Sequence, residues 1–451
     1  MTKSVAFYTL GCKVNQYETG RMEQQFREAG YEVLDPTRFA SVYVINTCTV
    51  TRLAERKSRQ FLRRARRQNP DAILAVVGCY PTVNPDEVRG IGDIDIVLDN
   101  DRKEQIVECV EACEEERSAQ RIRSSCEDSG SFDAAVSPGN LSGQRTRATI
   151  KIQDGCDRFC TYCVIPYARG HIRSRPLEDI VTESERLIEG GARELVLAGI
   201  NTALYGAEKG SGSDGVIDIV RAIGRLPGDF RIRLGSLEPT VVDAAYVERL
   251  LACEKLCHHL HLSLQSGSDR ILRVMHRRYS VEDYMDIVRV VRDADSHYAI
   301  TTDIIAGFPG ETDEDFRASL DVIRAVGFLK VHAFPYSRRP FTEAAEMGDQ
   351  ISTAVKKERV RQMNDVSGTV AFEYLSGLRG RQLRVLPEET VPGEPGQAMW
   401  KGRADRYVMV YVPAKEGMLP EGGFQTVTAG LPYGDGLAAA EEEQDDRMYI
   451  L

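Results

Sequence analysis

Short runs of hydrophobic residues alternate with longer amphipathic stretches over residues 1–113. Each run is apolar at nearly every position, which is typical of parallel strands that are covered on both faces. Because helical stretches lie between the runs, the pattern predicts an N-terminal doubly wound parallel α/β domain. The strand candidates are Val5–Leu10, Val42–Asn46, Ile73–Val77 and Ile94–Leu98.

Residues 114–145 lack this alternation. A charged stretch is followed by a segment rich in Ser, Gly and Asp, which predicts a linker. The alternation returns in residues 146–375, where six βα units and a helix over 351–375 predict a central partial (βα)6 barrel. Its strand candidates are Ala148–Gln153, Glu194–Ala198, Arg231–Ser236, His259–Gln265, Ile300–Ile305 and Leu329–Tyr336.

Gly/Pro turns and alternating runs such as Arg406–Val412 mark residues 376–440. This pattern predicts a small antiparallel β-barrel. Residues 441–451 are acidic and are expected to form a frayed tail. The predicted fold class is therefore α/β, with the small β-barrel as a C-terminal addition.

Composition excludes several classes of protein. The 451 residues are 42% hydrophobic and 28% charged, which are ordinary globular values. The chain has no 18-residue apolar run and no signal-peptide pattern, so we expect a cytoplasmic protein without a membrane partner. The net charge of −10 argues against indiscriminate binding of nucleic acids. Eleven cysteines in a reducing compartment indicate metal binding or catalysis rather than disulfides.

The strongest chemical signal is the CxxxCxxC motif of Cys156, Cys160 and Cys163, at the carboxyl end of the first barrel strand. Three thiolates can bind three irons of a [4Fe–4S] cluster and leave the fourth iron open to a substrate. The alternative is structural zinc, which normally has a fourth Cys or His ligand. His171 is near, but it lies outside the common spacing.

A second set of cysteines comprises Cys12, Cys48 and Cys79, each at the end of an apolar strand. The carboxyl ends of parallel strands share one edge of the sheet, so the three thiols are expected to converge there. The alternative is three inert, buried cysteines.

Residues 52–67 hold eight basic residues and one acidic residue, directly after Cys48. Such a run is usually a solvated helix face. In an acidic protein this concentration favours a role in binding phosphates.

The cysteine motif of the barrel resembles the radical S-adenosylmethionine (SAM) superfamily. Taken together, this motif and the three N-terminal cysteines resemble the methylthiotransferase family, and most closely its MtaB branch. The resemblance covers nearly the whole chain. The matching segments are Thr9–Glu18, Asn46–Thr51, Gly78–Tyr80, Gly155–Gly170, Leu264–Ser268 and Thr302–Glu311.

This resemblance implies an enzyme with two [4Fe–4S] clusters, ligated by the six cysteines named above, and SAM. It implies a radical reaction at C2 of threonylcarbamoyladenosine 37 in the anticodon loop of tRNA, supported by an external low-potential electron donor. Related enzymes act on isopentenyladenosine in tRNA or on a ribosomal-protein aspartate, and these substrates remain alternatives. A non-enzymatic iron–sulfur RNA-binding protein is a further alternative.

The resemblance also suggests a SAM pocket at the barrel strand ends. Tyr162 is expected near the adenine, the backbone at Gly199 near the methionine amino group, and Arg277 near a carboxylate. Several pocket residues fit equally well as helix caps or turn residues. The remaining candidates for the pocket are Ser236, Glu238, Gln265 and Asp303.

Two further features follow from the resemblance. Residues 376–440 resemble a TRAM domain, whose basic residues would add a second RNA-binding surface. The segment Ser337–Thr342 departs from the family pattern, because Phe341 stands where Gly is expected. Gly permits backbone conformations that Phe resists, so the sequence leaves the conformation of this loop open. The basic residues of the TRAM-like region are Arg379, Arg381, Arg384, Lys401, Arg403 and Arg406.

Overall fold

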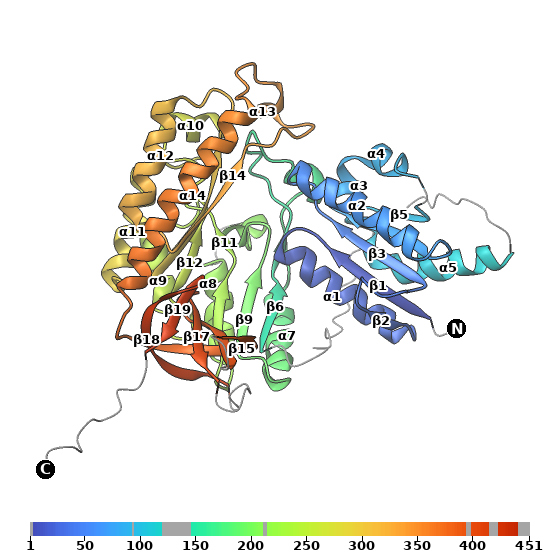
Figure 1. Cartoon of the computed structure of the whole chain (residues 1–451), viewed down its shortest axis with the longest axis horizontal. Coiled ribbons are helices and arrows are strands. Elements are labelled where there is room, and N and C mark those ends of the chain that lie inside the picture. Colours follow the sequence, from blue (N-terminus) through green and yellow to red (C-terminus); the bar gives the residue numbers. More distant parts are fainter. Residues whose placement is uncertain are drawn as a thin grey trace, which may run out of the picture.

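The computed structural model describes residues 3–92, 94–119, 146–210, 214–393, 398–414 and 423–440. Figure 1 shows the N-terminal domain beside the central sheet, with the C-terminal strands at one end of that sheet. The predicted tail, 441–451, and residues 120–145 of the predicted linker lie outside the described residues. Residues 114–119 belong to helix α5 (Ile106–Ala119), so the helix continues into the stretch assigned to the linker.

The N-terminal domain is a parallel sheet with the order β2-β1-β3-β4-β5. Apolar side chains line both faces of its central strands: α1 and α5 cover one face and α2 covers the other. This confirms the predicted doubly wound domain, although the short, partly polar strand β2 was not predicted. Its elements are β1 (Ser4–Thr9), α1 (Lys13–Glu28), β2 (Glu32–Leu34), β3 (Val42–Thr47), α2 (Arg52–Gln68), β4 (Ile73–Gly78), α3 (Cys79–Val83), α4 (Pro85–Arg89) and β5 (Ile96–Leu98).

The central region is an open, curved parallel sheet in two segments, β6-β9-β10 and β11-β12-β13-β14. Strand β10 is followed after one residue by β11, which joins the segments into the predicted partial barrel. The strands are β6 (Arg147–Lys151), β9 (Glu194–Ala198), β10 (Arg231–Leu234), β11 (Ser236–Leu237), β12 (His259–Leu262), β13 (Ala299–Ala306) and β14 (Lys330–Pro335), and a two-residue hairpin pairs β7 (Gln153–Asp154) with β8 (Arg173–Ser174).

Helices cover the outer face of this sheet. Alternate strand residues such as Leu260 and Leu262 pack against them, which directs His259 and His261 to the inner face. Side-chain caps start several helices; Ser280 and Thr312, for example, each form a capping box. The helices are α6 (Ile165–Arg169), α7 (Leu177–Glu189), α8 (Val216–Gly224), α9 (Ala244–Leu251), α10 (Asp269–Val274), α11 (Val281–Ala294), α12 (Asp313–Val326), α13 (Glu343–Glu346) and α14 (Thr353–Ser376).

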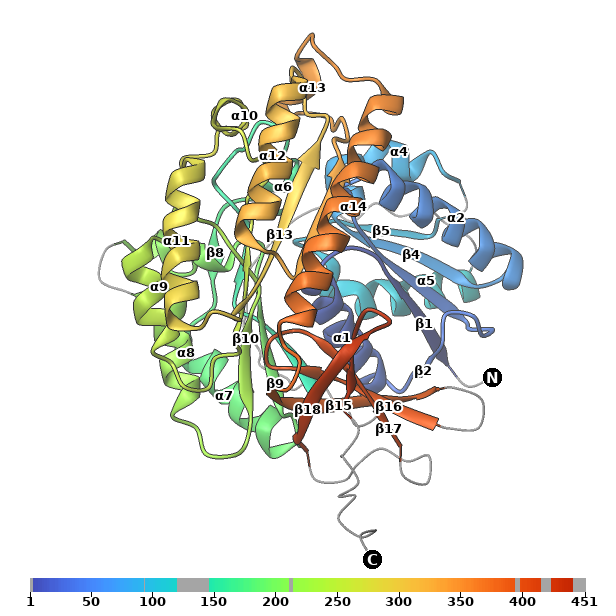
Figure 2. The same cartoon turned by 60° about the vertical axis from the view of Figure 1, so that its left-hand side comes forward.

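The C-terminal strands close into a small barrel in the order β15-β16-β17-β19-β18. The pairing is antiparallel as predicted, except between β17 and β19, which run parallel. Figure 2 shows the small barrel below the end where β9 and β10 begin. Its strands are β15 (Gln382–Pro392), β16 (Ala398–Ala404), β17 (Met409–Pro413), β18 (Gln425–Tyr433) and β19 (Gly436–Ala439).

A buried ion cluster joins the small barrel to the central sheet. The Glu194 carboxylate accepts hydrogen bonds from Arg231 Nε at 2.7 Å and Arg233 Nε at 2.8 Å. The same two arginines donate to the carbonyl oxygens of Arg403 and Ala404. Burial alone would raise the pKa of Glu194, but the arginines outweigh it and hold this pKa well below its usual range.

No helix in the described part of the chain has the length and apolar character needed to cross a membrane.

Replacing Glu194 by Ala should destabilise the protein by about 3–5 kcal/mol, because two buried guanidinium groups lose their carboxylate. The midpoint of urea unfolding of the apoprotein, followed by circular dichroism, measures this loss. Arg361→Ala removes exposed ion pairs with Glu358 and Asp365 and should cost at most about 1 kcal/mol. In the wild type, the stabilisation from Glu194 should be complete above the unfolded carboxyl pKa of about 4.3 and decrease as the pH falls below it.

Candidate functional site

The three N-terminal cysteines meet at the carboxyl edge of their sheet. Cys12 precedes α1, Cys48 follows β3 and Cys79 begins α3 after β4. Gly11, with a φ of +109°, brings the first two together: a Cβ on Gly11 would lie 2.9 Å from Cys48 Cβ. The sheet order changes direction between β1 and β3, and ligands bind at such a point in doubly wound folds.

The barrel cysteines lie on the loop between β7 and α6. Gly155 is required there, because a Cβ on it would lie 1.8 Å from the carbonyl oxygen of His171. The His171 side chain is 86% exposed, and its Nδ1 lies 2.6 Å from Asp157 Oδ1. The imidazole is therefore directed to a surface carboxylate, and the structure gives it no role as a fourth ligand beside Cys156, Cys160 and Cys163.

The donor set of each triad tests which metal group it fits. Structural zinc normally takes four Cys or His ligands, whereas each triad supplies three thiolates, and His171 beside the barrel triad is directed to Asp157. Three thiolates suit a [4Fe–4S] cluster, in which they can bind three irons and leave the fourth open.

Burial keeps several of these thiols protonated in the metal-free protein. It raises the pKa of Cys48 to about 12 and the pKa of Cys156 to about 11, and the neighbouring cysteines add to both shifts. Iron must therefore displace protons when it binds, and the free energy of binding will depend on pH.

A buried arginine connects the two triads. Arg169, at the end of α6, donates from Nη2 to Asn15 Oδ1 at 2.6 Å and from Nη1 to Glu18 Oε1 at 3.0 Å. It also donates to Asp154 at 3.1 Å. Asn15 and Glu18 belong to α1, just after Cys12, whereas Asp154 lies two residues before Cys156. One guanidinium group thus links the segments that carry both sets of cysteines.

Two lysines complete this cluster. Lys151 Nζ lies 2.8 Å from Glu18 Oε1 and 2.6 Å from Asp154 Oδ2, and Lys103 Nζ lies 2.6 Å from Glu18 Oε2. Burial would raise the pKa of Glu18, but the two lysines and Arg169 hold it well below its usual range. We call Glu18, Lys103, Lys151, Asp154 and Arg169 the interdomain ion cluster.

Glu238 is the centre of the polar groups at the barrel strand ends. Its carboxylate accepts hydrogen bonds from Asn201 Nδ2 at 2.5 Å, Arg158 Nε at 3.0 Å and Arg277 Nη1 at 3.4 Å. Arg277 Nη1 also lies 3.5 Å from Cys160 Sγ. Asn201 Oδ1 is buried and has no hydrogen-bond partner among the described residues. An acceptor left without a donor beside the cysteines fits a site for a polar ligand.

The other predicted pocket residues have varied surroundings. Tyr162 packs against the apolar cluster around Ile271 and Met275. A Cβ on Gly199 would lie 3.0 Å from Gln153 Oε1, so this glycine has a packing role. Ser236 begins β11, and its carbonyl accepts a hydrogen bond from Thr202. Gln265 has a positive φ of 69° and bonds through its backbone to β13.

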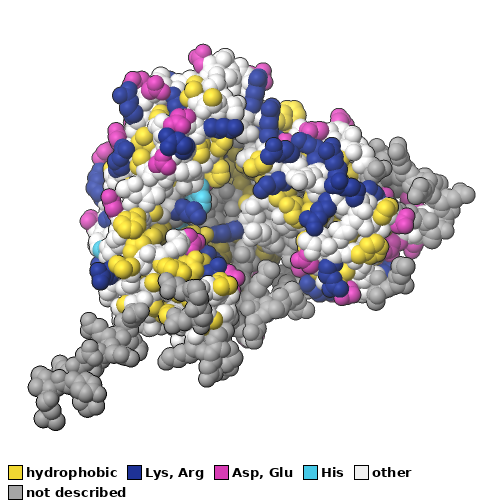
Figure 3. Space-filling model, viewed as in Figure 1, with side chains coloured by type: hydrophobic (Ala, Val, Ile, Leu, Met, Phe, Trp, Pro, Cys, Tyr) yellow, Lys and Arg dark blue, Asp and Glu magenta, His cyan; other side chains and the backbone are white. Residues whose placement is uncertain are grey.

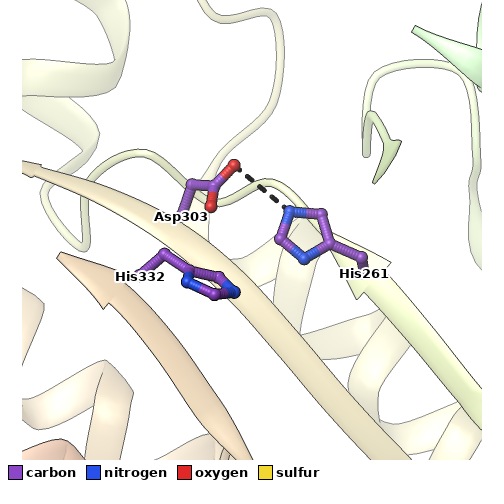
Figure 4. Close-up of side chains that lie close together, drawn as sticks. All are labelled: His261, Asp303 and His332. Atoms are coloured by element: carbon purple, nitrogen blue, oxygen red, sulfur yellow. Dashed lines mark hydrogen bonds and ion pairs between the residues drawn. The ribbon is translucent and has the colours of Figure 1, made fainter. Parts of the chain in front are cut away.

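Asp303 points into the barrel and is paired with a histidine that the sequence analysis did not select. Figure 4 shows Asp303 beside His261, with His332 close by. His261 Nε2 lies 3.2 Å from Asp303 Oδ2. The three residues occupy adjacent strands, β12, β13 and β14, on the inner face. Strand alternation could have indicated them, because each is polar and alternates with core residues.

Comparisons with known proteins agree with this geometry. Residues 150–323 match the radical SAM superfamily, and residues 4–99 match the uncharacterized protein family UPF0004. The threonylcarbamoyladenosine tRNA methylthiotransferase MtaB of Bacillus subtilis is 38% identical over 99% of both chains. That of Thermotoga maritima is 36% identical over 86% of this chain and 87% of its own.

The chain belongs to the MtaB family of radical SAM methylthiotransferases. Radical SAM proteins bind a [4Fe–4S] cluster and SAM, and these are cofactors of this methylthiotransferase. Among solved structures, the methyltransferase TsrM from Kitasatospora setae is similar in fold, with a TM-score of 0.55 and 18% identity over 76% of this chain and 77% of its own.

The basic stretch of this methylthiotransferase forms helix α2, capped by Thr51 just after Cys48. Arg59 pairs with Glu87 and Arg66 pairs with Asp95, so these two arginines hold the domain together. Four others make no side-chain hydrogen bond or ion pair with the described residues: Arg56, Lys57, Arg63 and Arg64. Figure 3 shows Lys and Arg side chains gathered on this domain. A groove of about 680 Å³ is lined by Arg56, Arg59, Gln60, Leu62, Arg63, Arg66, Arg67, Leu74, Ile91 and Gly92.

The C-terminal barrel offers less free positive charge than its sequence suggests. Arg406 bonds Asp295 at 2.5 Å, Lys401 bonds Glu389 at 2.8 Å, and Arg403 lies 3.4 Å from Glu388. Arg384 pairs with Asp229. These side chains therefore hold the barrel together and fix it to the central sheet.

Changing Arg169 to Lys should lower the thermal unfolding midpoint of the apoprotein by several degrees. A lysine cannot reach Asn15, Glu18 and Asp154 together, so buried acceptors lose their donors. Differential scanning fluorimetry measures the shift. Arg173→Lys is the matched control, because Arg173 lies 3.9 Å from Asp154 and its side chain is 40% exposed. An equal, small effect of both substitutions would contradict the importance of the interdomain ion cluster.

Proposed function

We propose that this chain converts N6-threonylcarbamoyladenosine at position 37 of tRNA to its 2-methylthio derivative. The observation that supports this most directly is the pair of cysteine triads joined by Arg169, in a chain that is similar to MtaB enzymes over almost its whole length. C2 of adenine is neither acidic nor electrophilic enough for easy polar chemistry, so a radical route fits the substrate.

Both triads have roles in this proposal. Cys156, Cys160 and Cys163 would hold the cluster that binds SAM, and Cys12, Cys48 and Cys79 would hold a second [4Fe–4S] cluster. When bound, these cofactors supply radical chemistry and hold the sulfur for transfer. An external low-potential donor supplies the electrons, and we place the enzyme in the cytoplasm with its tRNA.

The residues around Glu238 would hold SAM. Arg277 is positioned to pair with the methionine carboxylate, since it lies beside Cys160. Glu238 can accept hydrogen bonds from the ribose hydroxyls, and Asn201 Oδ1 can accept one from the ligand. Tyr162, Gly199, Ser236, Gln265 and Asp303 complete the proposed pocket.

Triple replacement of each cysteine set by Ala should separate the two parts of the reaction. Without the barrel triad, iron should fall from about eight to about four per chain and formation of 5′-deoxyadenosine should cease, because the ligands are lost outright. Without the N-terminal triad, 5′-deoxyadenosine should persist and no methylthio product should form. Iron analysis and mass spectrometry of tRNA nucleosides provide the measurements.

Two results would count against the proposal. Methylthio product at wild-type yield without Cys12, Cys48 and Cys79 would make them inert buried thiols. Tyr31→Phe is a control for the N-terminal domain, because it alters the core of that domain and leaves Cys12, Cys48 and Cys79 in place. The tRNA nucleosides of a strain that lacks the gene identify the substrate. If that strain loses methylthiolated isopentenyladenosine and keeps methylthiolated threonylcarbamoyladenosine, the enzyme belongs to the other tRNA branch.

The side chains of α2 that make no hydrogen bond or ion pair with the described residues should bind phosphates of tRNA. Replacing Arg56, Lys57, Arg63 and Arg64 by Gln should weaken tRNA binding and flatten its salt dependence, by about 0.7–0.9 in the log–log slope for each lost contact. Fluorescence anisotropy over a salt series measures the slope. Arg66→Gln is the control, because its partner is Asp95, and it should leave the slope unchanged.

A further inference from the structure

Three aromatic rings form an exposed row beside the barrel cysteines. Phe159 and Tyr167 are each 47% exposed, and Phe341 is 65% exposed. The ring centroids of Phe159 and Tyr167 are 5.9 Å apart, and those of Tyr167 and Phe341 are 6.0 Å apart. The rings come from three separate segments: the cysteine loop, helix α6 and the loop after β14. We call these three residues the aromatic row.

Two members of the aromatic row have left-handed backbone conformations. Phe341 has a φ of 64° and Phe159 has a φ of 47°. Such a conformation is unfavourable for a bulky residue, and glycine would adopt it at lower cost. Burial of the ring does not compensate for the strain at Phe341, because most of its side chain is exposed. An exposed, strained aromatic residue of this kind points to a function rather than to packing.

The loop that carries Phe341 is fixed at both ends. Arg339 is buried, pairs with Glu55 of α2 and donates to Thr49 Oγ1 at 3.0 Å. Thr342 Oγ1 donates to the carbonyl of Arg339 at 2.8 Å, and the backbone of Ala344 bonds that of Thr161. The rings are therefore held in place before any partner arrives, which reduces the entropy lost on binding.

The same contacts place the aromatic row next to the basic helix. The backbone N–H of Arg52, at the start of α2, donates to Ser337 Oγ at 3.4 Å. At the other end of the row, Phe159 lies between Cys156 and Cys160 in the sequence. Exposed aromatic faces thus follow the basic side chains of α2 that have no partner among the described residues. This combination matches single-stranded RNA, in which phosphates and unstacked bases are both accessible.

We propose that the aromatic row stacks the bases adjacent to nucleotide 37 in the anticodon loop and so holds that nucleotide at the barrel cysteines. This inference rests on the proposed function and adds the means of positioning the substrate. Stacking on Phe341 and Tyr167 requires no particular base, because every base has a π face. The row would therefore accept tRNAs that differ in the nucleotides around position 37.

Binding of an anticodon stem-loop oligonucleotide to the reconstituted holoenzyme tests this proposal. Phe341→Leu and Tyr167→Leu should each weaken binding about fivefold or more, in line with the contribution of one base stacked on an aromatic ring. The salt slope should remain unchanged, because no phosphate contact is lost. With 2-aminopurine next to position 37, the quenching on binding should decrease in both variants.

Two further variants keep the test interpretable. Phe341→Gly relieves the backbone strain, so this variant should fold with an unchanged or higher unfolding midpoint. It should nevertheless bind RNA as weakly as Phe341→Leu, because it also lacks the ring. Phe372→Leu alters an exposed phenylalanine on α14, 60% exposed, and should leave binding unchanged. Wild-type affinity and quenching in both Phe341→Leu and Tyr167→Leu would overturn the proposal and leave the row as a surface for another protein. A wild-type enzyme that binds RNA without modifying it would contradict the proposed function instead.

Discussion

The ion pairing of Arg169 with Glu18 and Asp154 is the constraint on which the arrangement of the two cysteine triads depends. Transferring these charges from water is costly, and it is offset only if the partners meet in good geometry. Glu18 follows Cys12 by six residues, Asp154 precedes Cys156 by two, and Arg169 follows Cys163 by six. Displacement of either domain would therefore leave buried charges unpaired, and this penalty fixes the position of one triad relative to the other.

Glu194 imposes the same kind of constraint at the opposite end of the barrel, where Arg231 and Arg233 reach carbonyl groups of the small C-terminal barrel. Much of the positive charge of that barrel is used in contacts within the chain. In the described part of the chain, positive charge without an ion-pair partner remains on α2, beside the N-terminal cysteines. The protein has a net charge of −10, so most of its surface repels the phosphates of RNA. The positive charge of α2 therefore favours RNA that approaches on the side of the cysteines.

Continuous apolar runs were sufficient to predict β1, β3 and β4 and the convergence of the cysteines at their ends, because buried parallel strands have few alternative patterns. Strand β2 was missed because it is a short edge strand with an exposed Glu32. The interdomain ion cluster was also missed: Lys103 and Glu18 look like surface residues in the sequence, and only the docking of two domains buries them. Hydrophobic runs do not indicate His261 and His332, because these are polar residues that alternate with the apolar residues of β12 and β14.

Phe341 illustrates a different limit. The sequence suggested that a residue other than glycine would resist the expected loop conformation, yet the loop adopts a left-handed conformation at this position with the phenylalanine in place. The buried pair of Arg339 and Glu55 anchors the loop, and this tertiary contact outweighs the local preference of the backbone. The contact between the domains therefore determines the backbone conformation of Phe341, against the local preference of a bulky residue. The consequence is that the interface which orders the cysteines also holds an exposed ring beside them.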